Sequence, residues 1–235
     1  MIKTHKITYK VFLFERVKKK LPFFDTETYP LQIRLTAGAR TIYLKSRFFA
    51  LLRLNKYRQQ MLYNENKISI DDVIGYEEEL MKYILDQERE SASLDAIRRE
   101  YGFLSYDILH ELDERFKQFL VDFFYAGKLP AYAMFIKNDG ANHSSEFILY
   151  TLEKSLHPAV FENLLITAVE KAPPYIPFIK FFREITHNPL PLFPVYQWQQ
   201  GQMVNEFTGF IEKKFPEYKA ANPADYINEL LKKTV

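Results

Sequence analysis

Residues 29–45 read YPLQIRLTAGARTIYLK, and this stretch decides the fold of the N-terminal part of the chain. Apolar side chains alternate with polar ones on both sides of a short turn at residues 37–39, at Leu31, Ile33, Leu35, Ile42 and Leu44. Such alternation predicts strands with one buried face, and the Gly-containing turn between the two runs predicts a β-hairpin.

Residues 7–14, ITYKVFLF, alternate in the same way and predict a third strand, whereas residues 16–28 contain three consecutive lysines and Pro22 and predict a loop. Successive side chains of a strand point to opposite faces, so the face opposite the apolar one is polar, basic and almost free of acid. That face is predicted to contain Thr8, Lys10, Gln32, Arg34, Thr36, Thr41, Tyr43 and Lys45.

Helices are predicted to follow. Residues 46–63 predict one helix whose apolar positions wrap around it, and Ser69 with Asp72 forms a capping box that opens another. Residues 107–126 show an amphipathic stripe that ends at Gly127. Further helix starts are predicted at Ser144 or Ser145, at Pro158 and at Asn222-Pro223.

Residues 173–194 contain six of the 12 prolines together with Tyr175 and four phenylalanines. Their composition predicts an extended or irregular strap that packs over the helical core, with a partner-docking segment as the alternative. The predicted fold class is α+β: a small three-stranded antiparallel sheet with a helix at the N-terminus, followed by a mainly α-helical domain. The expected domains are a basic module at 1–65 and an acidic helical domain at 66–235 that carries the strap.

The charge of this chain is unevenly distributed. The 235 residues hold 32 Lys and Arg against 30 Asp and Glu, a net charge of +2. Residues 1–60 alone hold 14 basic and 3 acidic side chains, or +11, which leaves −9 for the remainder. A nucleic acid, an anionic membrane surface or an acidic protein surface, including this chain's own acidic part, would each attract such a module. A solvated basic face without a partner is the fourth interpretation.

Nucleic acid is the favoured partner, because a small sheet fits the major groove of duplex DNA and residues 46–63 lack the apolar face with a basic rim that membrane binding needs. Arg34 and Gln32 are of the types that contact guanine and adenine, whereas the loop lysines suit phosphates. The predicted DNA-binding residues are Lys10, Lys18, Lys19, Lys20, Gln32, Arg34, Arg40, Tyr43, Lys45, Arg47, Arg53, Lys56 and Arg58.

A resemblance to a known family supports this interpretation. The run ITYKVFLF at 7–14, the lysines at 18–20, YPLQIRLT at 29–36, GAR at 38–40 and TIYLK at 41–45 resemble the N-terminal arm-type DNA-binding domain of tyrosine recombinases, the phage and transposon integrases, especially the Bacteroidetes type. The resemblance implies a three-stranded sheet in the major groove with a helix behind it. It covers residues 7–45, under a fifth of the chain.

The chain departs from that family after residue 45. The family continues with a Gly-Ile/Val-x-Val stretch and a Trp-Asp pair, whereas here Lys45-Ser46-Arg47-Phe48 follows and the one Trp is Trp198. Recombinase chemistry needs a Tyr nucleophile and an Arg-His-x-x-Arg set, and none of the five His is followed by x-x-Arg. The sequence therefore predicts no catalytic residue, and the resemblance implies a non-catalytic DNA-binding protein linked to a mobile element or prophage.

Other chemistry has weak support in the sequence. The absence of Cys excludes disulfides and thiolate metal sites, and no Gly-rich nucleotide-binding loop occurs. Carboxylates and His gather in two places, Asp139, His143 and Glu146, and Asp107, His110, Glu111, Asp113 and Glu114. A metal-dependent nuclease would use such groups, but turn formation and a solvated helix face explain them, so no metal site and no cofactor are predicted.

A third functional interpretation is a protein-interaction or inhibitor module that uses the acidic helical domain. No apolar run approaches the length of a membrane span, and the N-terminus lacks the apolar region of a signal peptide. The sequence therefore predicts a cytoplasmic protein with no membrane partner.

Overall fold

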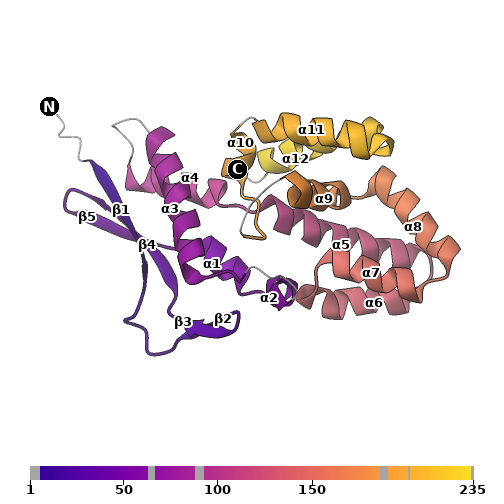
Figure 1. The fold of residues 1–235 in the computed structure, drawn as a ribbon, viewed down its shortest axis with the longest axis horizontal. Coiled ribbons are helices and arrows are strands. Elements are labelled where there is room, and N and C mark those ends of the chain that lie inside the picture. The colour runs from indigo at the N-terminus through magenta and orange to yellow at the C-terminus, as the bar shows by residue number, and fades with distance from the viewer. Residues whose placement is uncertain (1–5, 63–66, 88–92, 186–189, 201, 234–235) are drawn as a thin grey trace. The chain divides into compact units, whose positions relative to one another are not determined.

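The computed structural model describes residues 6–62, 67–87, 93–185, 190–200 and 202–233 (Figure 1). The chain divides into two compact units, Met1–Tyr106 with Pro189–Pro191, and Asp107–Asn188 with Leu192–Val235. The first unit thus continues beyond residue 65, where the change in charge suggested a boundary.

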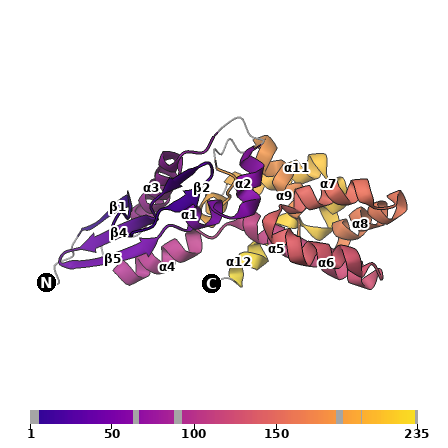
Figure 2. The ribbon, with the colours of Figure 1, turned by 90° about the horizontal axis from the view of Figure 1, so that it is seen from below.

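The first unit is built on the three-stranded antiparallel sheet that the sequence predicts. Its strands are β1 (Ile7–Leu13), β4 (Leu31–Ala37) and β5 (Arg40–Lys45), in the order β1-β4-β5 (Figure 2). Ala37 pairs with Arg40, so the β4–β5 turn has two residues, and Gly38 there adopts a φ of 58°. That backbone conformation favours glycine, which explains why the turn falls at this point.

One face of the sheet is covered by helices of the same unit. These are α1 (Arg47–Leu52), α3 (Ile70–Gln87) and α4 (Leu94–Leu104); α3 contacts β1, and α4 contacts β4. The inward side chains are buried against them: Val11, Leu31, Ile33, Leu35, Ile42 and Leu44. The alternation of apolar and polar residues therefore predicted the two faces of the sheet correctly. Helix α3 begins at the predicted capping box, where Ser69 and Asp72 exchange hydrogen bonds.

The predicted loop over residues 16–28 is wrong for its second half. It contains the hairpin of β2 (Leu21–Phe23) and β3 (Thr26–Thr28). Phe23 is buried and its ring stacks on Phe49 of α1 at a centroid distance of 5.4 Å. This tertiary contact stabilises a hairpin too short to show any periodicity in the sequence.

The single helix predicted over residues 46–63 is two helices, α1 and α2 (Asn55–Leu62), separated at Arg53-Leu54. Because of this break, the apolar positions of residues 46–63 belong to two helices with separate buried faces, and they form no single stripe. Phe48, Phe49 and Leu52 of α1 are buried as a short stripe of their own.

The second unit is helical within its described residues. Its elements are α5 (Ile108–Ala126), α6 (Pro130–Asp139), η1 (Gly140–Asn142), α7 (Ser145–Ser155), α8 (Pro158–Lys171), α9 (Tyr175–Ile185), α10 (Val195–Gln199), α11 (Gln202–Lys214), η2 (Pro216–Ala221) and α12 (Pro223–Lys232). The starts of α5, α7, α8 and α12 agree with the predictions from capping residues and prolines. Helices α4, α6, α10 and α11 were not predicted from the sequence.

The predicted extended strap at residues 173–194 is wrong between residues 175 and 185, which form α9. Pro177 lies in the first turn of this helix, where proline removes no helical hydrogen bond. The predicted burial of its aromatic residues is confirmed, because Phe178 contacts the rings of Phe193, Trp198 and Phe207 in the core of the unit. Among the described residues, no helix has the length and hydropathy to cross a membrane.

Candidate nucleic-acid interface

The uncovered face of the three-stranded sheet carries a regular array of nine side chains. Strand register arranges them in three cross-strand rows: Thr8, Thr36 and Thr41; Lys10, Arg34 and Tyr43; and Phe12, Gln32 and Lys45. We call these nine residues the outer sheet face. Every member except Phe12 was predicted from the sequence to lie on this face.

The outer sheet face is cationic. Lys10, Arg34 and Lys45 are exposed, and the nine residues include no acid. No acidic side chain in the described part of the chain pairs with any of these three cations. Lys10 and Arg34 also lie directly opposite one another in adjacent strands, an arrangement of like charges that destabilises a sheet. An external anion would remove this repulsion.

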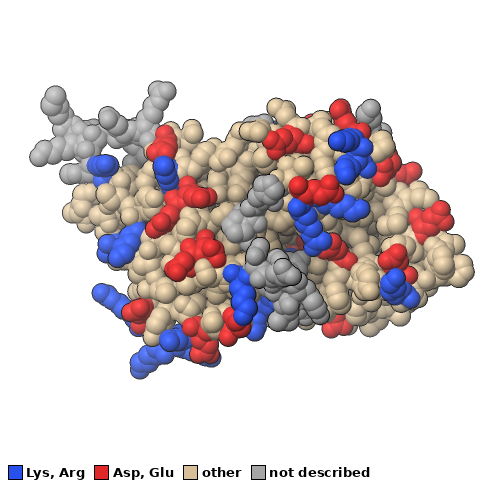
Figure 3. Space-filling view, viewed as in Figure 1, with Lys and Arg blue, Asp and Glu red and all other residues tan. Residues whose placement is uncertain are grey.

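Helix α3, which covers the other face of the sheet, is acidic. Helix α3 exposes five acids, Asp71, Asp72, Glu78, Glu79 and Asp86. Figure 3 shows acidic side chains gathered over this helix. Among the described residues of this unit, a cluster of exposed acids thus lies on α3 and three cations without an acidic partner lie on the outer sheet face, an asymmetry that would orient the unit toward a polyanion.

Two aromatic rings complete the outer sheet face. The rings of Phe12 and Tyr43 meet edge to face with centroids 6.4 Å apart, and Tyr43 is 55% exposed. Phe12 is apolar and therefore was not among the polar and basic residues predicted for this face. The alternation of residues 7–14 already placed it on the same face as Lys10.

The predicted loop lysines lie beyond the Leu13 end of β1. Lys18, Lys19 and Lys20 are exposed between β1 and β2, and the Lys20 ammonium is 5.5 Å from the centroid of the Tyr29 ring. They follow the end of β1 that carries Phe12, in the same row as Gln32 and Lys45.

Two further predicted DNA-binding residues make contacts with α4. Arg40 pairs with Asp95 at 3.0 Å. Arg47 donates a hydrogen bond of 2.5 Å to the carbonyl of Gly102 and lies over the ring of Tyr106. These cations link the sheet and α1 to the helix behind them.

The other three predicted cations belong to the region of the β2–β3 hairpin and α2. The guanidinium of Arg53 donates to the carbonyl of Pro22 at 3.1 Å, and that of Arg58 donates to the carbonyl of Phe24 at 3.3 Å. Lys56 is buried. Four of the thirteen predicted residues, Arg40, Arg47, Arg53 and Arg58, thus have hydrogen bonds or ion pairs within the first unit, and Lys56 is buried.

A buried carboxyl group lies behind the sheet. Glu77 of α3 is fully buried, and its Oε1 accepts hydrogen bonds from the hydroxyls of Ser46 at 2.5 Å and Tyr101 at 3.0 Å. Burial raises the pKa of Glu77 to about 7, against the opposing effects of these hydrogen bonds, one from the backbone of Phe48 and the charge of Arg47. Burial also raises the pKa of Tyr101.

The same cluster ties the end of β5 to α1. Ser46 caps α1 by accepting a hydrogen bond from the amide of Phe49 at 3.0 Å, and its own amide donates to the carbonyl of Leu31 in β4. Tyr101 accepts from the amide of Arg47 at 3.0 Å. Glu77 therefore supports the segment that follows Lys45 of the outer sheet face.

The predicted carboxylate and His clusters of the second unit serve its fold. Asp107 caps α5 through the amide of His110 and also accepts from the amide of Phe193, both at 2.6 Å. Asp113 accepts from the amide of Ser145 at 2.7 Å and pairs with Lys117 at 2.9 Å.

Two candidates of the other cluster, Glu146 and His143, also contact side chains of the second unit. Glu146 pairs with Arg183, and the ring of His143 stacks on Phe147. Among the described residues, no three His, Asp or Glu side chains converge in a group that could hold a metal ion.

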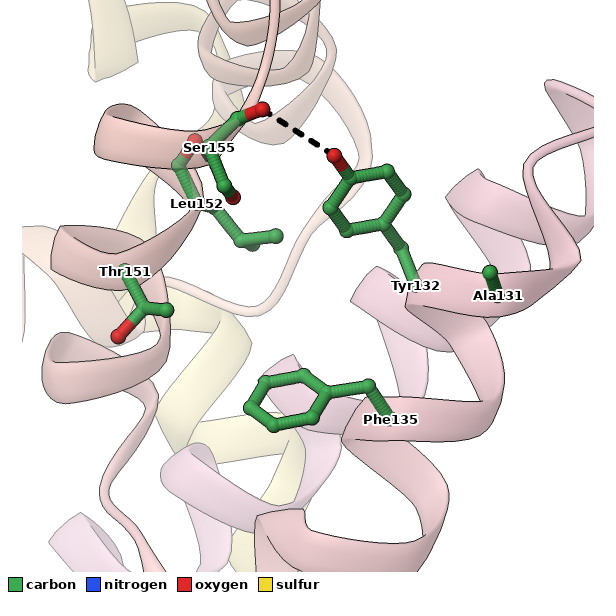
Figure 4. Close-up of a pocket in the computed structure, with 6 residues that line it drawn as sticks. All are labelled: Ala131, Tyr132, Phe135, Thr151, Leu152 and Ser155. Atoms are coloured by element: carbon green, nitrogen blue, oxygen red, sulfur yellow. Dashed lines mark hydrogen bonds between the residues drawn. The ribbon is translucent and has the colours of Figure 1, made fainter.

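A small apolar groove lies between α6 and α7 (Figure 4). It has a volume of about 260 Å³ and is lined by Ala131, Tyr132, Phe135, Thr151, Leu152 and Ser155. The hydroxyls of Tyr132 and Thr151 donate to the backbone carbonyls of Ser155 and Phe147. The residues that line the groove therefore present a mainly apolar surface and include no acidic or basic side chain.

No protein-family model matches this chain, and comparisons with curated proteins and with solved structures also find no match. The interpretation of the outer sheet face therefore depends on its own residues.

Proposed function

We propose that this chain is a non-catalytic DNA-binding protein whose first unit binds duplex DNA through the outer sheet face. The observation that carries the proposal is the position of Lys10, Arg34 and Lys45, three exposed cations on a face without an acid. Phosphate neutralisation by such side chains releases counterions and supplies affinity for any sequence.

The geometry of the sheet suits the major groove. A β-ribbon or small sheet can enter this groove, where Arg contacts guanine and Gln contacts adenine through paired hydrogen bonds. Arg34 and Gln32 lie on the central strand β4, in the best position to reach base edges. Lys10 and Lys45 on the outer strands, and the loop lysines, would contact phosphates on either side.

The link to a mobile element or prophage depends on the resemblance of residues 7–45 to the arm-type domains of integrases. Under this proposal the chain corresponds to the front end of an integrase without recombinase chemistry. We place its action in the cytoplasm, where such DNA would be bound.

The proposal is tested by measuring the binding of random-sequence duplex DNA across a salt series. We expect affinity to fall steeply with salt, and the double variant Lys10→Ala/Lys45→Ala to weaken binding and to reduce the slope of log affinity against log salt by about two, because both side chains would contact phosphates. Lys82→Ala is the matched control, because Lys82 is an exposed cation on α3. Absence of binding at low salt would overturn the proposal.

Protein binding through the second unit is a second candidate function, supported by the apolar groove. Phe135, which lines the groove, is exposed on α6, and Met134, Phe147 and Tyr150 are further exposed apolar residues of α6 and α7. Exposed apolar surface favours a protein contact. A protein complex that persists at high salt and is lost in Phe135→Ser would support this function. DNA binding that is unaffected by Phe135→Ser would separate the two.

A further inference from the structure

The aromatic pair of the outer sheet face lies over its central strand. Phe12 is in β1 opposite Gln32, and Tyr43 is in β5 opposite Arg34, yet their rings meet at 6.4 Å with an interplanar angle of 70°. The two side chains must therefore lean toward one another across β4. They form an apolar surface between the two residues of β4 that can read bases.

This apolar surface is open to solvent. Tyr43 is 55% exposed. Phe12 is half-buried, and it lies on the outer face because its neighbours in sequence, Val11 and Leu13, are on the inner face of the strand. Aromatic residues bury large areas when a partner covers them, so an exposed pair surrounded by Lys10, Arg34 and Lys45 is well placed to contact an apolar group that lies among anionic ones. The major groove of duplex DNA offers this combination, because phosphates flank base edges on which thymine carries a methyl group.

The spacing of the array agrees with that of base pairs. Arg34 and Gln32 are two residues apart in β4, which corresponds to about 6.8 Å along an antiparallel strand. Successive base pairs of duplex DNA are about 3.4 Å apart. If β4 runs along the groove, these two side chains reach bases about two steps apart, and the aromatic pair lies over the step between them.

We propose that Phe12 and Tyr43 form a subsite for the 5-methyl group of thymine in the major groove. The methyl group is the one apolar feature that distinguishes a base edge there, and Phe is among the side chains that contact it. The outer sheet face then prefers a thymine between the bases read by Arg34 and Gln32. This inference rests on the proposed function, since it concerns the same face.

The test replaces every thymine of a duplex by deoxyuridine, which removes the methyl group and keeps the hydrogen-bonding groups. The wild-type protein should bind the thymine duplex about fourfold more tightly for each methyl group contacted, the effect of burying one such group. Tyr43→Phe should retain the preference, because it keeps the ring. Tyr43→Thr should lose it, and threonine suits an exposed strand position, so the fold is preserved.

The outcomes separate the two proposals. Equal affinity of the wild-type protein for thymine and deoxyuridine duplexes would overturn the thymine subsite and leave the DNA-binding proposal intact. Failure to bind either duplex would overturn both. Tighter binding to single-stranded DNA than to the duplex, lost in Tyr43→Thr, would also overturn the thymine subsite, since the rings would then stack on unpaired bases.

Discussion

The hydroxyl of Ser46 donates a hydrogen bond of 2.5 Å to the buried carboxyl group of Glu77, 31 residues further along the chain. This contact joins the segment after β5 to α3, and the hydroxyl of Tyr101 in α4 reaches the same oxygen. The sheet that carries the cationic face is thus supported from behind by one ionisable group.

The first prediction concerns the pH dependence of stability. The pKa of Glu77 rises from an ordinary value of 4.5 to about 7 in the folded chain, so the folded state holds this proton more tightly than the unfolded state. The resulting stabilisation is fully present below about pH 4.5 and is lost as the pH rises to about 7, a decline of about 3 kcal/mol. Glu77→Gln should lack this decline in urea unfolding followed by circular dichroism.

Glu78→Gln is the matched control, because Glu78 is the exposed neighbour of Glu77 on α3. It should show the same decline as the wild-type chain. If Glu77→Gln also lost stability over this pH range, the proton would not reside on Glu77.

The second prediction concerns the repulsion between Lys10 and Arg34. Because these like charges face one another across β1 and β4, Lys10→Thr should raise the free energy of unfolding by about 0.3 kcal/mol at low salt. The same change should weaken binding to duplex DNA and lower its salt dependence. Thermal unfolding and fluorescence anisotropy measure the two effects, and the gain in stability should vanish in high salt.

A loss of stability in Lys10→Thr at low salt would contradict this account. It would show that packing of the Lys10 side chain on the sheet outweighs the repulsion.

The third prediction concerns the loop lysines. Replacing Lys18, Lys19 and Lys20 together with Ala should weaken binding to all duplex sequences alike and reduce the salt slope by up to about three, since these side chains would contact phosphates. The preference for thymine over deoxyuridine should remain. The control is a triple alanine variant of three exposed lysines in the second unit, Lys128, Lys137 and Lys171. An equal loss in the control would mean that net charge, rather than position, determines binding.

The fourth prediction concerns Asp107, which is buried and holds the amides of His110 and Phe193. Asp107→Ala removes a helix cap and leaves a buried amide without its partner, so it should destabilise the second unit by about 3 kcal/mol. The single Trp of the chain, Trp198, lies in the core of this unit and reports its unfolding by fluorescence.

Asp122→Ala, at an exposed position of the same helix, should cost less than about 0.5 kcal/mol. DNA binding should be unchanged in both variants at temperatures where they are folded. Equal stability of Asp107→Ala and the wild-type chain would show that water accepts the hydrogen bonds of the His110 and Phe193 amides in place of Asp107.

The sequence by itself determined which side chains share a face of each regular element. A strand repeats every two residues, so the alternation in residues 7–14 and 29–45 was enough to place Lys10, Arg34, Tyr43 and Lys45 together. A helix repeats every 3.6 residues, so the stripe through Val73 and Leu80 already included Glu77. These are local properties, set by the geometry of the chain.

Only the tertiary structure decided which distant residues those faces contact. Ser46 and Tyr101 lie 31 and 24 residues from Glu77, and no local pattern records that they converge on its carboxyl group. The same holds for Arg40, Arg47, Arg53 and Arg58, whose charges made them candidates for DNA. They reach carbonyls and a carboxylate of distant segments instead. A long cationic side chain binds whichever acceptor packing brings within reach, and packing depends on contacts between residues far apart in the chain.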